Sequence, residues 1–188
     1  GGVVTKGRDG RAKGVLSEDR GNECVRRRRN GRGLDPGGRD MRDIVAYCAF
    51  LSTGIPVGAE MEGQGFPRLQ PLKGDPTRGA TVFTSACARC HGPSGQGTAL
   101  APPLWGPRSY NVGAGMARIN TAASFIHGLM PIDRTQHLTP QQAFDVASYI
   151  NTRPRPDCPP KVRDWPRGGK PEDADYHILP TTRKEKTQ

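Results

Sequence analysis

Five consecutive residues, Cys87-Ala88-Arg89-Cys90-His91, form the pattern C-x-x-C-H, which is typical of covalent attachment of a c-type haem. Two thiols one helical turn apart can both reach the two vinyl groups of a haem and form thioethers. The adjacent His91 then lies beneath the iron and offers an imidazole nitrogen as the proximal ligand. The spacing therefore predicts one covalently bound haem c, held by Cys87 and Cys90.

Two other interpretations of a C-x-x-C pair are half of a zinc site and a redox dithiol. Zinc would need a second ligand pair at a suitable spacing, and the remaining candidates do not form one: His127, His137, Cys158 and His177. A dithiol of the thioredoxin type belongs to a βαβ unit, and no strand is predicted before Cys87. Both alternatives remain open, and the haem interpretation is favoured over them.

A sixth ligand to the iron is expected on the far side of the haem. A methionine sulfur there would raise the reduction potential, and a second histidine would lower it. The four methionines are Met41, Met61, Met116 and Met130. We choose Met130, because it ends a predicted helix immediately before Pro131, whose fixed φ makes the turn rigid. His127, three residues earlier on the same helical face, is the rival.

The loop after the haem motif contains candidates for secondary roles. A backbone carbonyl near Pro102 could accept a hydrogen bond from the free ring N–H of His91, which would fix the orientation of a ligating imidazole. The alternative role of Pro102 is to stiffen the loop. Trp105, with Tyr110 and Arg108, is a candidate for contact with the haem edge and propionates.

The elements that must position these residues are helices. Apolar residues recur at helical spacing from Asp40 to about residue 51, and Asp75-Pro76 and Thr139-Pro140 are typical helix starts. A further short helix is predicted from Thr121 to Leu129. Residues 92–115 form a long loop rich in Gly and Pro, and no strand is predicted. The sequence therefore indicates an all-helical chain.

The composition supports a ligand that fills the interior. Only 34% of the 188 residues are hydrophobic and 6% aromatic, while the chain contains 25 Gly and 18 Pro. A covalently held porphyrin would supply apolar volume that these side chains lack. No apolar run approaches the ~20 residues that a membrane span needs.

The charge is uneven along the chain. The formal net charge is +10, and it belongs mostly to the ends, especially to the run Arg26–Arg29. We interpret this run as a solvated arm, because no aromatic residues or known nucleic-acid-binding spacing accompany it. Nucleic-acid binding is therefore not expected, whereas the positive charge would steer acidic protein partners.

Residues 74–152 resemble the class I cytochromes c. The residues that carry this resemblance are Gly79 and Phe83 before the haem motif, Pro102-Pro103, Met130-Pro131, and Tyr149 in the closing helix. More narrowly, the chain is similar to the C-terminal part of the dihaem cytochromes c of the thiosulfate dehydrogenase type, through the stretches 30–34, 41–52 and 97–107. The resemblance implies a class I cytochrome c fold, in which helices wrap around the haem.

The resemblance and the composition together imply a division of the chain. We expect an irregular or disordered arm (1–29), the last helix of a first cytochrome c domain (30–55), a linker (56–73), a monohaem cytochrome c domain (74–152) and an irregular tail (153–188). The family's active-site haem is the first one, and no upstream C-x-x-C-H is present here. We therefore expect the catalytic half to be missing, and Cys24, the match to that haem's cysteine ligand, to be an unpaired thiol.

The function implied is one-electron transfer through a haem ligated by His91 and Met130. The alternative is the electron-relay half of a thiosulfate dehydrogenase that forms tetrathionate, with thiosulfate as a ligand of the intact parent. The expected partners are redox proteins. Because covalent haem attachment implies export, we expect the parent to be periplasmic, although residues 1–29 contain no signal peptide.

Overall fold

The computed structural model describes residues 3–4, 15–56, 59, 65–66, 68–166 and 168–179. In chain order the regular elements are β1 (Val3–Val4), β2 (Val15–Leu16), α1 (Ser17–Glu23), the π-helix η1 (Cys24–Arg28), α2 (Arg39–Leu51), α3 (Pro76–Val82), the π-helix η2 (Phe83–Cys87), α4 (Ala88–His91), the 3-10 helix η3 (Gly115–Ala117), α5 (Ile119–Leu129), α6 (Pro140–Asn151) and the 3-10 helix η4 (Pro159–Arg163). The expected all-helical architecture is confirmed. Among the described residues, the one exception is the two-residue antiparallel ribbon of β1 and β2, which was not predicted.

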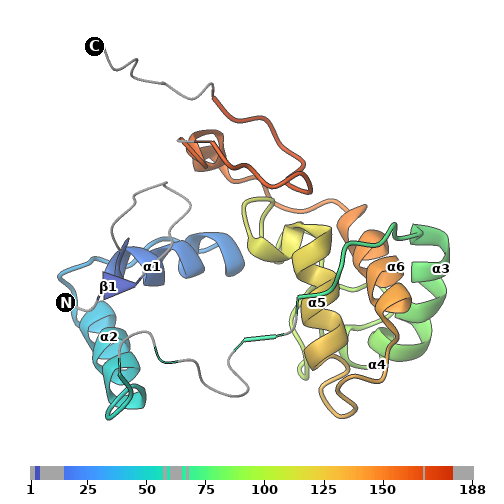
Figure 1. The fold of residues 1–188 in the computed structure, drawn as a ribbon, viewed down its shortest axis with the longest axis horizontal. Coiled ribbons are helices and arrows are strands. Elements are labelled where there is room, and N and C mark those ends of the chain that lie inside the picture. Colours follow the sequence, from blue (N-terminus) through green and yellow to red (C-terminus); the bar gives the residue numbers. More distant parts are fainter. Residues whose placement is uncertain are drawn as a thin grey trace.

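The helices from α3 to α6 form one packed group, in which α3 and α6 lie side by side and α5 lies against α6 (Figure 1). Their shared core consists of buried apolar side chains between residues 83 and 150: Phe83, Trp105, Ala122, Ala123, Ile126, Leu138, Ala143, Phe144, Val146, Ala147 and Ile150. Alanine provides four of the eight core residues of α5 and α6, and such small side chains allow close helix packing.

The predicted helix starts at Asp75 and Thr139 are both confirmed. The Asp75 side chain accepts hydrogen bonds from the backbone N–H of Thr77 and Arg78 at 2.7 and 3.2 Å, and Pro76 occupies the first turn. Thr139 forms a reciprocal capping box with Gln142, because each side chain bonds the other's backbone N–H. These caps fix where α3 and α6 begin, and therefore how the two helices meet.

The crossing of α3 and α6 depends on Gly79. An added Cβ at Gly79 would lie 2.6 Å from the Asp145 carbonyl carbon and 2.8 Å from the Tyr149 Cβ. Asp145, buried in α6, accepts hydrogen bonds from the Asp75 N–H at 2.8 Å and from the Arg78 guanidinium at 2.8 and 2.9 Å. Burial opposes ionisation of Asp145, but these hydrogen bonds outweigh it and lower its pKa. The start of α3 is thus attached to the middle of α6.

The expectation that residues 1–29 are irregular is wrong for residues 17–28, which form α1 and η1. Acidic residues Glu18 and Asp19 lie in the first turn of α1, where the helix dipole favours them. The segment is also held by polar contacts: the side chain of Asn22 exchanges hydrogen bonds with the backbone of Leu34 at 2.7 and 2.9 Å. Residues 1–2 and 5–14 of the expected arm lie outside the described residues.

The segment after α6 crosses back over the rest of the molecule. Backbone N–H groups of Gly106 and Val112 donate to the carbonyls of Pro154 and Pro156 at 2.8 and 3.0 Å. Apart from η4, the described part of the tail is irregular, and Figure 1 shows it above α1 and α5. Residues 167 and 180–188 of the tail, and parts of the expected linker 56–73, lie outside the described residues.

None of the described helices combines the length and the apolar character needed to cross a membrane.

Candidate functional site

The C-x-x-C-H motif lies where η2 passes into α4. Cys87 is the last residue of η2, and Cys90 and His91 end α4, whose next residue is Gly92 at φ 79°. This positive φ favours glycine and lets the chain turn away directly after His91. Cys87, Cys90 and His91 are all partly exposed. The motif thus presents its two thiols and its imidazole at the surface of the helical core.

The loop that follows folds back over the motif. The Gly97 N–H donates to the His91 carbonyl at 2.9 Å, and the Thr98 hydroxyl donates to the Cys90 carbonyl at 2.5 Å. The Leu104 N–H in turn donates to the Gly95 carbonyl at 2.8 Å. The long loop therefore has a defined course around His91, as a loop that surrounds a rigid ligand requires.

His91 makes the hydrogen bond that was expected of it. Its Nδ1 lies 2.7 Å from the Pro102 carbonyl oxygen. A carbonyl oxygen can only accept, so Nδ1 carries the proton and Nε2 keeps its lone pair. Among the described residues, Nε2 makes no hydrogen bond. This is the tautomer and orientation that a histidine ligand to iron needs, and the donor set therefore fits a haem.

Apolar side chains that would face a porphyrin gather beside the motif. Cys87 and Met130 both pack against the edge of the same hydrophobic core, as do Ala86, Leu104 and Met116. Burial, followed by the neighbouring Cys90 thiol, raises the pKa of Cys87 to about 11, so the thiol is protonated at neutral pH. The surroundings of Cys87 are thus apolar rather than those of an activated thiolate.

Met130 lies at the C-terminus of α5 with an extended backbone, and its peptide bond to Pro131 is cis. The loop after it contacts the haem-motif helix, because Asp133 forms an ion pair with Arg89 at 2.6 Å. The structure thus brings the segment of Met130 against the segment of Cys87, Cys90 and His91. His127, the rival, has its Nδ1 2.8 Å from the Leu138 carbonyl oxygen.

Trp105 lies inside the core. Its side chain is 8% exposed and contacts Phe83 and Tyr149, with ring centroids 5.0 and 5.9 Å apart. Tyr110 lies under the Arg155 guanidinium, 4.4 Å from the ring centroid, and burial raises the pKa of its phenol. Arg108 lines a separate cavity of about 300 Å³ beside Thr98 and Pro103. Contact of these three residues with a haem stays a prediction.

No three His, Cys, Asp or Glu side chains gather to hold a metal ion in the part of the chain that the structure describes. Within that part, the zinc interpretation of Cys87 and Cys90 finds no further ligands.

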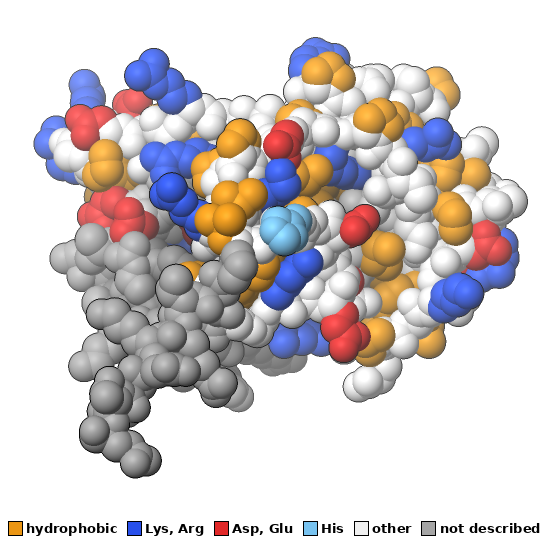
Figure 2. Space-filling view, turned by 90° about the horizontal axis from the view of Figure 1, so that it is seen from above, with side chains coloured by type: hydrophobic (Ala, Val, Ile, Leu, Met, Phe, Trp, Pro, Cys, Tyr) orange, Lys and Arg blue, Asp and Glu red, His pale blue; other side chains and the backbone are white. Residues whose placement is uncertain are grey.

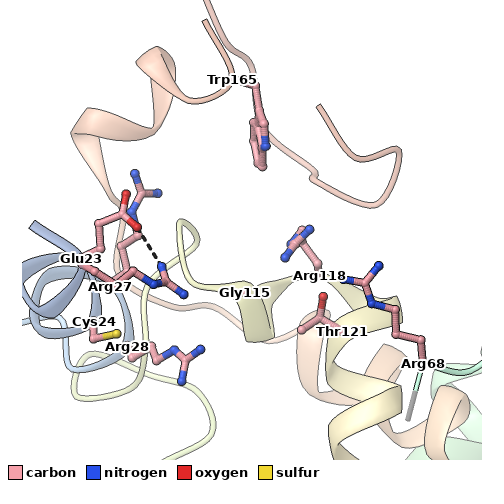
Figure 3. A pocket seen from close by; sticks show the side chains of 10 residues that line it. Glu23, Cys24, Arg27, Arg28, Arg68, Gly115, Arg118, Thr121 and Trp165 are labelled. Carbon is pink, nitrogen blue, oxygen red and sulfur yellow. Dashed lines mark hydrogen bonds and ion pairs between the residues drawn. The ribbon is translucent and has the colours of Figure 1, made fainter. Parts of the chain in front are cut away.

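A second cavity, of about 470 Å³, was not predicted. It lies between α1–η1 and the start of α5, and its lining contains five arginines: Arg20, Arg27, Arg28, Arg68 and Arg118. Figure 3 shows side chains of both regions facing the space between them, with Cys24 on one wall and Trp165 above. Within the described part of the chain, the buried Nε of Arg118 has no hydrogen-bond partner. The run Arg26–Arg29 is therefore not simply a solvated arm.

Comparison with known proteins agrees with this geometry. A family model described as "Cytochrome C oxidase, cbb3-type, subunit III" matches residues 74–150. A cytochrome c-553-like protein of Synechocystis is 31% identical over 81 residues, which are 43% of this chain and 71% of that protein. Fold and site thus define a helical haem protein with the class I cytochrome c fold. The chain belongs to the c-type cytochromes; it binds one haem c and transfers electrons.

The similarity extends beyond the haem domain. A thiosulfate dehydrogenase of Psychrobacter arcticus is 40% identical over 164 residues, which are 84% of this chain and 50% of that protein. The solved structure of a thiosulfate dehydrogenase (TsdBA) from Marichromatium purpuratum superposes with a TM-score of 0.77 at 38% identity, over 95% of this chain and 40% of that chain. The expected resemblance to this type of cytochrome is confirmed. The chain spans about half the length of the curated thiosulfate dehydrogenases it matches.

Proposed function

We propose that this chain carries single electrons through a haem c that Cys87 and Cys90 attach and that His91 and Met130 ligate. The single observation that carries the proposal is the hydrogen bond from His91 Nδ1 to the Pro102 carbonyl at 2.7 Å, directly after a C-x-x-C pair. The haem supplies the Fe(II)/Fe(III) couple. In this proposal residues 74–152 form the haem domain, and residues 30–55 correspond to the last helix of a preceding one.

Each residue has a defined task in this proposal. Cys87 and Cys90 would hold the haem through two thioether bonds. His91 keeps its proton on Nδ1, where Pro102 accepts it, and presents Nε2. Met130 offers its sulfur from the end of α5. Trp105 stiffens the wall behind the loop, through its contacts with Phe83 and Tyr149.

Replacement of Met130 tests the ligand assignment. Met130→Ala should abolish the sulfur-to-iron charge-transfer band of the oxidised protein and lower its reduction potential, since a sulfur ligand raises it. Met116→Ala is the matched control, because Met116 packs against the same core. An unchanged band in Met130→Ala, or its loss only in Met116→Ala, would exclude Met130 as the ligand.

Acidic redox proteins are the proposed partners, and the periplasm of a bacterium is the proposed location. The net charge of +10 supports acidic partners, and Lys and Arg side chains are spread over the face drawn in Figure 2. Electron transfer to an acidic acceptor should slow as salt is added, whereas a rate independent of salt would contradict acidic partners.

Covalent attachment of haem supports a periplasmic location. Recovery of the haem-loaded full-length parent in the cytoplasmic fraction would contradict the location.

As a second candidate, we propose that the full-length parent is a thiosulfate dehydrogenase and that this chain is its electron-relay part. The names of the similar proteins and the arginine-lined cavity support this candidate. Arg20 and Arg27 are paired with Glu23 and Asp164, and the guanidinium groups of the other three arginines suit a small dianion. Thiosulfate should bind to the haem-loaded chain in calorimetry, and Arg118→Ala should weaken binding about tenfold or more. Arg134→Ala, outside the cavity, should not. Equal binding in both variants, or none in the unaltered chain, would contradict a thiosulfate site in this cavity.

A further inference from the structure

His127 is half-buried in the last turn of α5, three residues before Met130. Its Nδ1 lies 2.8 Å from the Leu138 carbonyl oxygen. As with His91, the carbonyl can only accept, so Nδ1 is the donor. The bond joins the end of α5 to the residue before Thr139, the N-cap of α6. The two ends of the loop 131–138 are thereby connected.

Few other contacts hold this loop. Residues 132–137 are exposed, and within the loop the Arg134 N–H donates to the Pro131 carbonyl and the His137 N–H to the Arg134 carbonyl, at 2.9 and 3.3 Å. The Arg89–Asp133 ion pair joins the loop to α4, but its side chains are 59% and 46% exposed and are screened by salt. The bond from His127 is half-buried, and it ends on Leu138, which is 4% exposed in the core. It is therefore the better protected of the two attachments.

The position of the Met130 sulfur depends on this loop. The Met130 N–H still bonds the Ile126 carbonyl at 2.9 Å, but the Met130 backbone is extended, so helical geometry no longer fixes the chain beyond it. A methionine side chain has three rotatable bonds and adapts its course to its surroundings. The backbone on both sides of Met130 must therefore be fixed for its sulfur to stay in one place.

We infer that His127 is a positioning residue for Met130: its hydrogen bond to the Leu138 carbonyl keeps the loop closed and holds the methionine sulfur at the iron. This inference rests on the proposed ligation by Met130. The role of His127 is then different from that of a rival ligand. Its Nδ1 holds the loop by a hydrogen bond, and the imidazole does not need to reach the metal.

Displacement of Met130 by added imidazole tests the inference in the haem-loaded chain. Loss of one hydrogen bond should make the sulfur easier to displace, so the apparent Kd for imidazole should fall about fivefold to tenfold in His127→Ala, and the charge-transfer band should weaken. His127→Asn should restore both properties, because the Asn amide nitrogen can occupy the place of Nδ1. His127→Gln should not restore them, since its amide lies further along the side chain. The exposed His137→Ala is the control and should match the unaltered chain.

The outcomes separate the inference from the proposal on which it rests. A charge-transfer band in the unaltered chain, with equal imidazole affinity in His127→Ala, would overturn only the inference. Equal behaviour of His127→Asn and His127→Gln would also overturn it, and these variants serve if His127→Ala does not fold. If the unaltered chain has no band and Met130→Ala changes nothing, ligation by Met130 and the inference both fail. Loss of the band in all three His127 variants would also overturn the inference, because His127→Asn keeps a donor at the place of Nδ1.

Discussion

Arg89 Nη2 lies 2.6 Å from Asp133 Oδ2, so one of the two residues between the cysteines of the haem motif is paired with the loop that follows Met130. The pair joins the segment of the proposed proximal ligand to that of the proposed distal ligand. The hydrogen bond from Arg89 is the main reason that the pKa of Asp133 lies below its ordinary value. The pair therefore stabilises the fold when Asp133 is ionised.

Asp133→Asn tests this ion pair. A carboxyl group with a lowered pKa contributes stability above its ordinary pKa of 3.8 and loses it as the pH falls through the lowered value. Asp133→Asn should therefore lower the Tm slightly at pH 7 in low salt. The difference should vanish once the pH falls below the lowered pKa of Asp133, and also in about 1 M salt, where charges are screened within about 3 Å. A difference that persists in high salt would show that the pair does not act through its charge.

Gly79→Ala tests the crossing of α3 and α6. The new Cβ would clash with the Asp145 backbone and the Tyr149 Cβ, so we expect a loss of about 1–3 kcal/mol in the free energy of unfolding. Gly37→Ala is the control, because the nearest atom to its Cβ, Asp35 Oδ1, is 3.8 Å away. Denaturant unfolding measures both variants, and equal midpoints would contradict the close contact.

Arg27→Ala tests how α1 and η1 are attached to the rest of the chain. Arg27 donates two hydrogen bonds to Asp164 at 2.6 and 2.8 Å, and Asp164 also accepts from the Tyr176 hydroxyl at 2.6 Å. Burial opposes the charge of Arg27, but Asp164 more than compensates and raises its pKa. Removal of one partner from a buried pair costs about 3–5 kcal/mol.

Hydrogen exchange of residues 17–28 should therefore become much faster in Arg27→Ala, while exchange in α6 changes less. Arg29→Ala, at an exposed position, provides the comparison. Unchanged protection of residues 17–28 in Arg27→Ala would mean that other contacts hold this segment.

Cys90→Ser tests the two thioether bonds. One vinyl group would stay unsaturated and conjugated with the porphyrin, so the α band of the reduced protein should move to longer wavelength while the haem remains attached through Cys87. Cys48→Ser, at an exposed position of α2, should leave the spectrum unaltered. If Cys90→Ser has the spectrum of the unaltered chain, Cys90 does not bind the haem.

The features that could be predicted from the sequence are local ones. The caps at Asp75 and Thr139, the end of α5 at Met130 and the C-x-x-C-H motif each depend on a few adjacent residues. The hydrogen bond from His91 to the loop near Pro102 could also be anticipated. A ligating imidazole needs an acceptor for its free N–H, and Pro102 is only eleven residues further along the chain.

The features that could not be predicted depend on distant residues. Arg27 and Asp164 are 137 positions apart, and no sequence motif beside either residue predicts that they pair. Polar contacts hold α1 and η1 in place, and the sequence of these helices has no apolar periodicity that would predict them. For the same reason, the arginine-lined cavity could not be seen in the sequence: Arg28 and Arg118 come from opposite walls.

The most direct test of the account is the intact mass of the chain after production with a c-type haem maturation system, followed by extraction with acidified acetone. We expect the mass of the polypeptide plus one haem, and a red colour that stays with the precipitated protein. A polypeptide of unmodified mass, or a pigment that passes into the solvent, would contradict covalent attachment of a haem at Cys87 and Cys90.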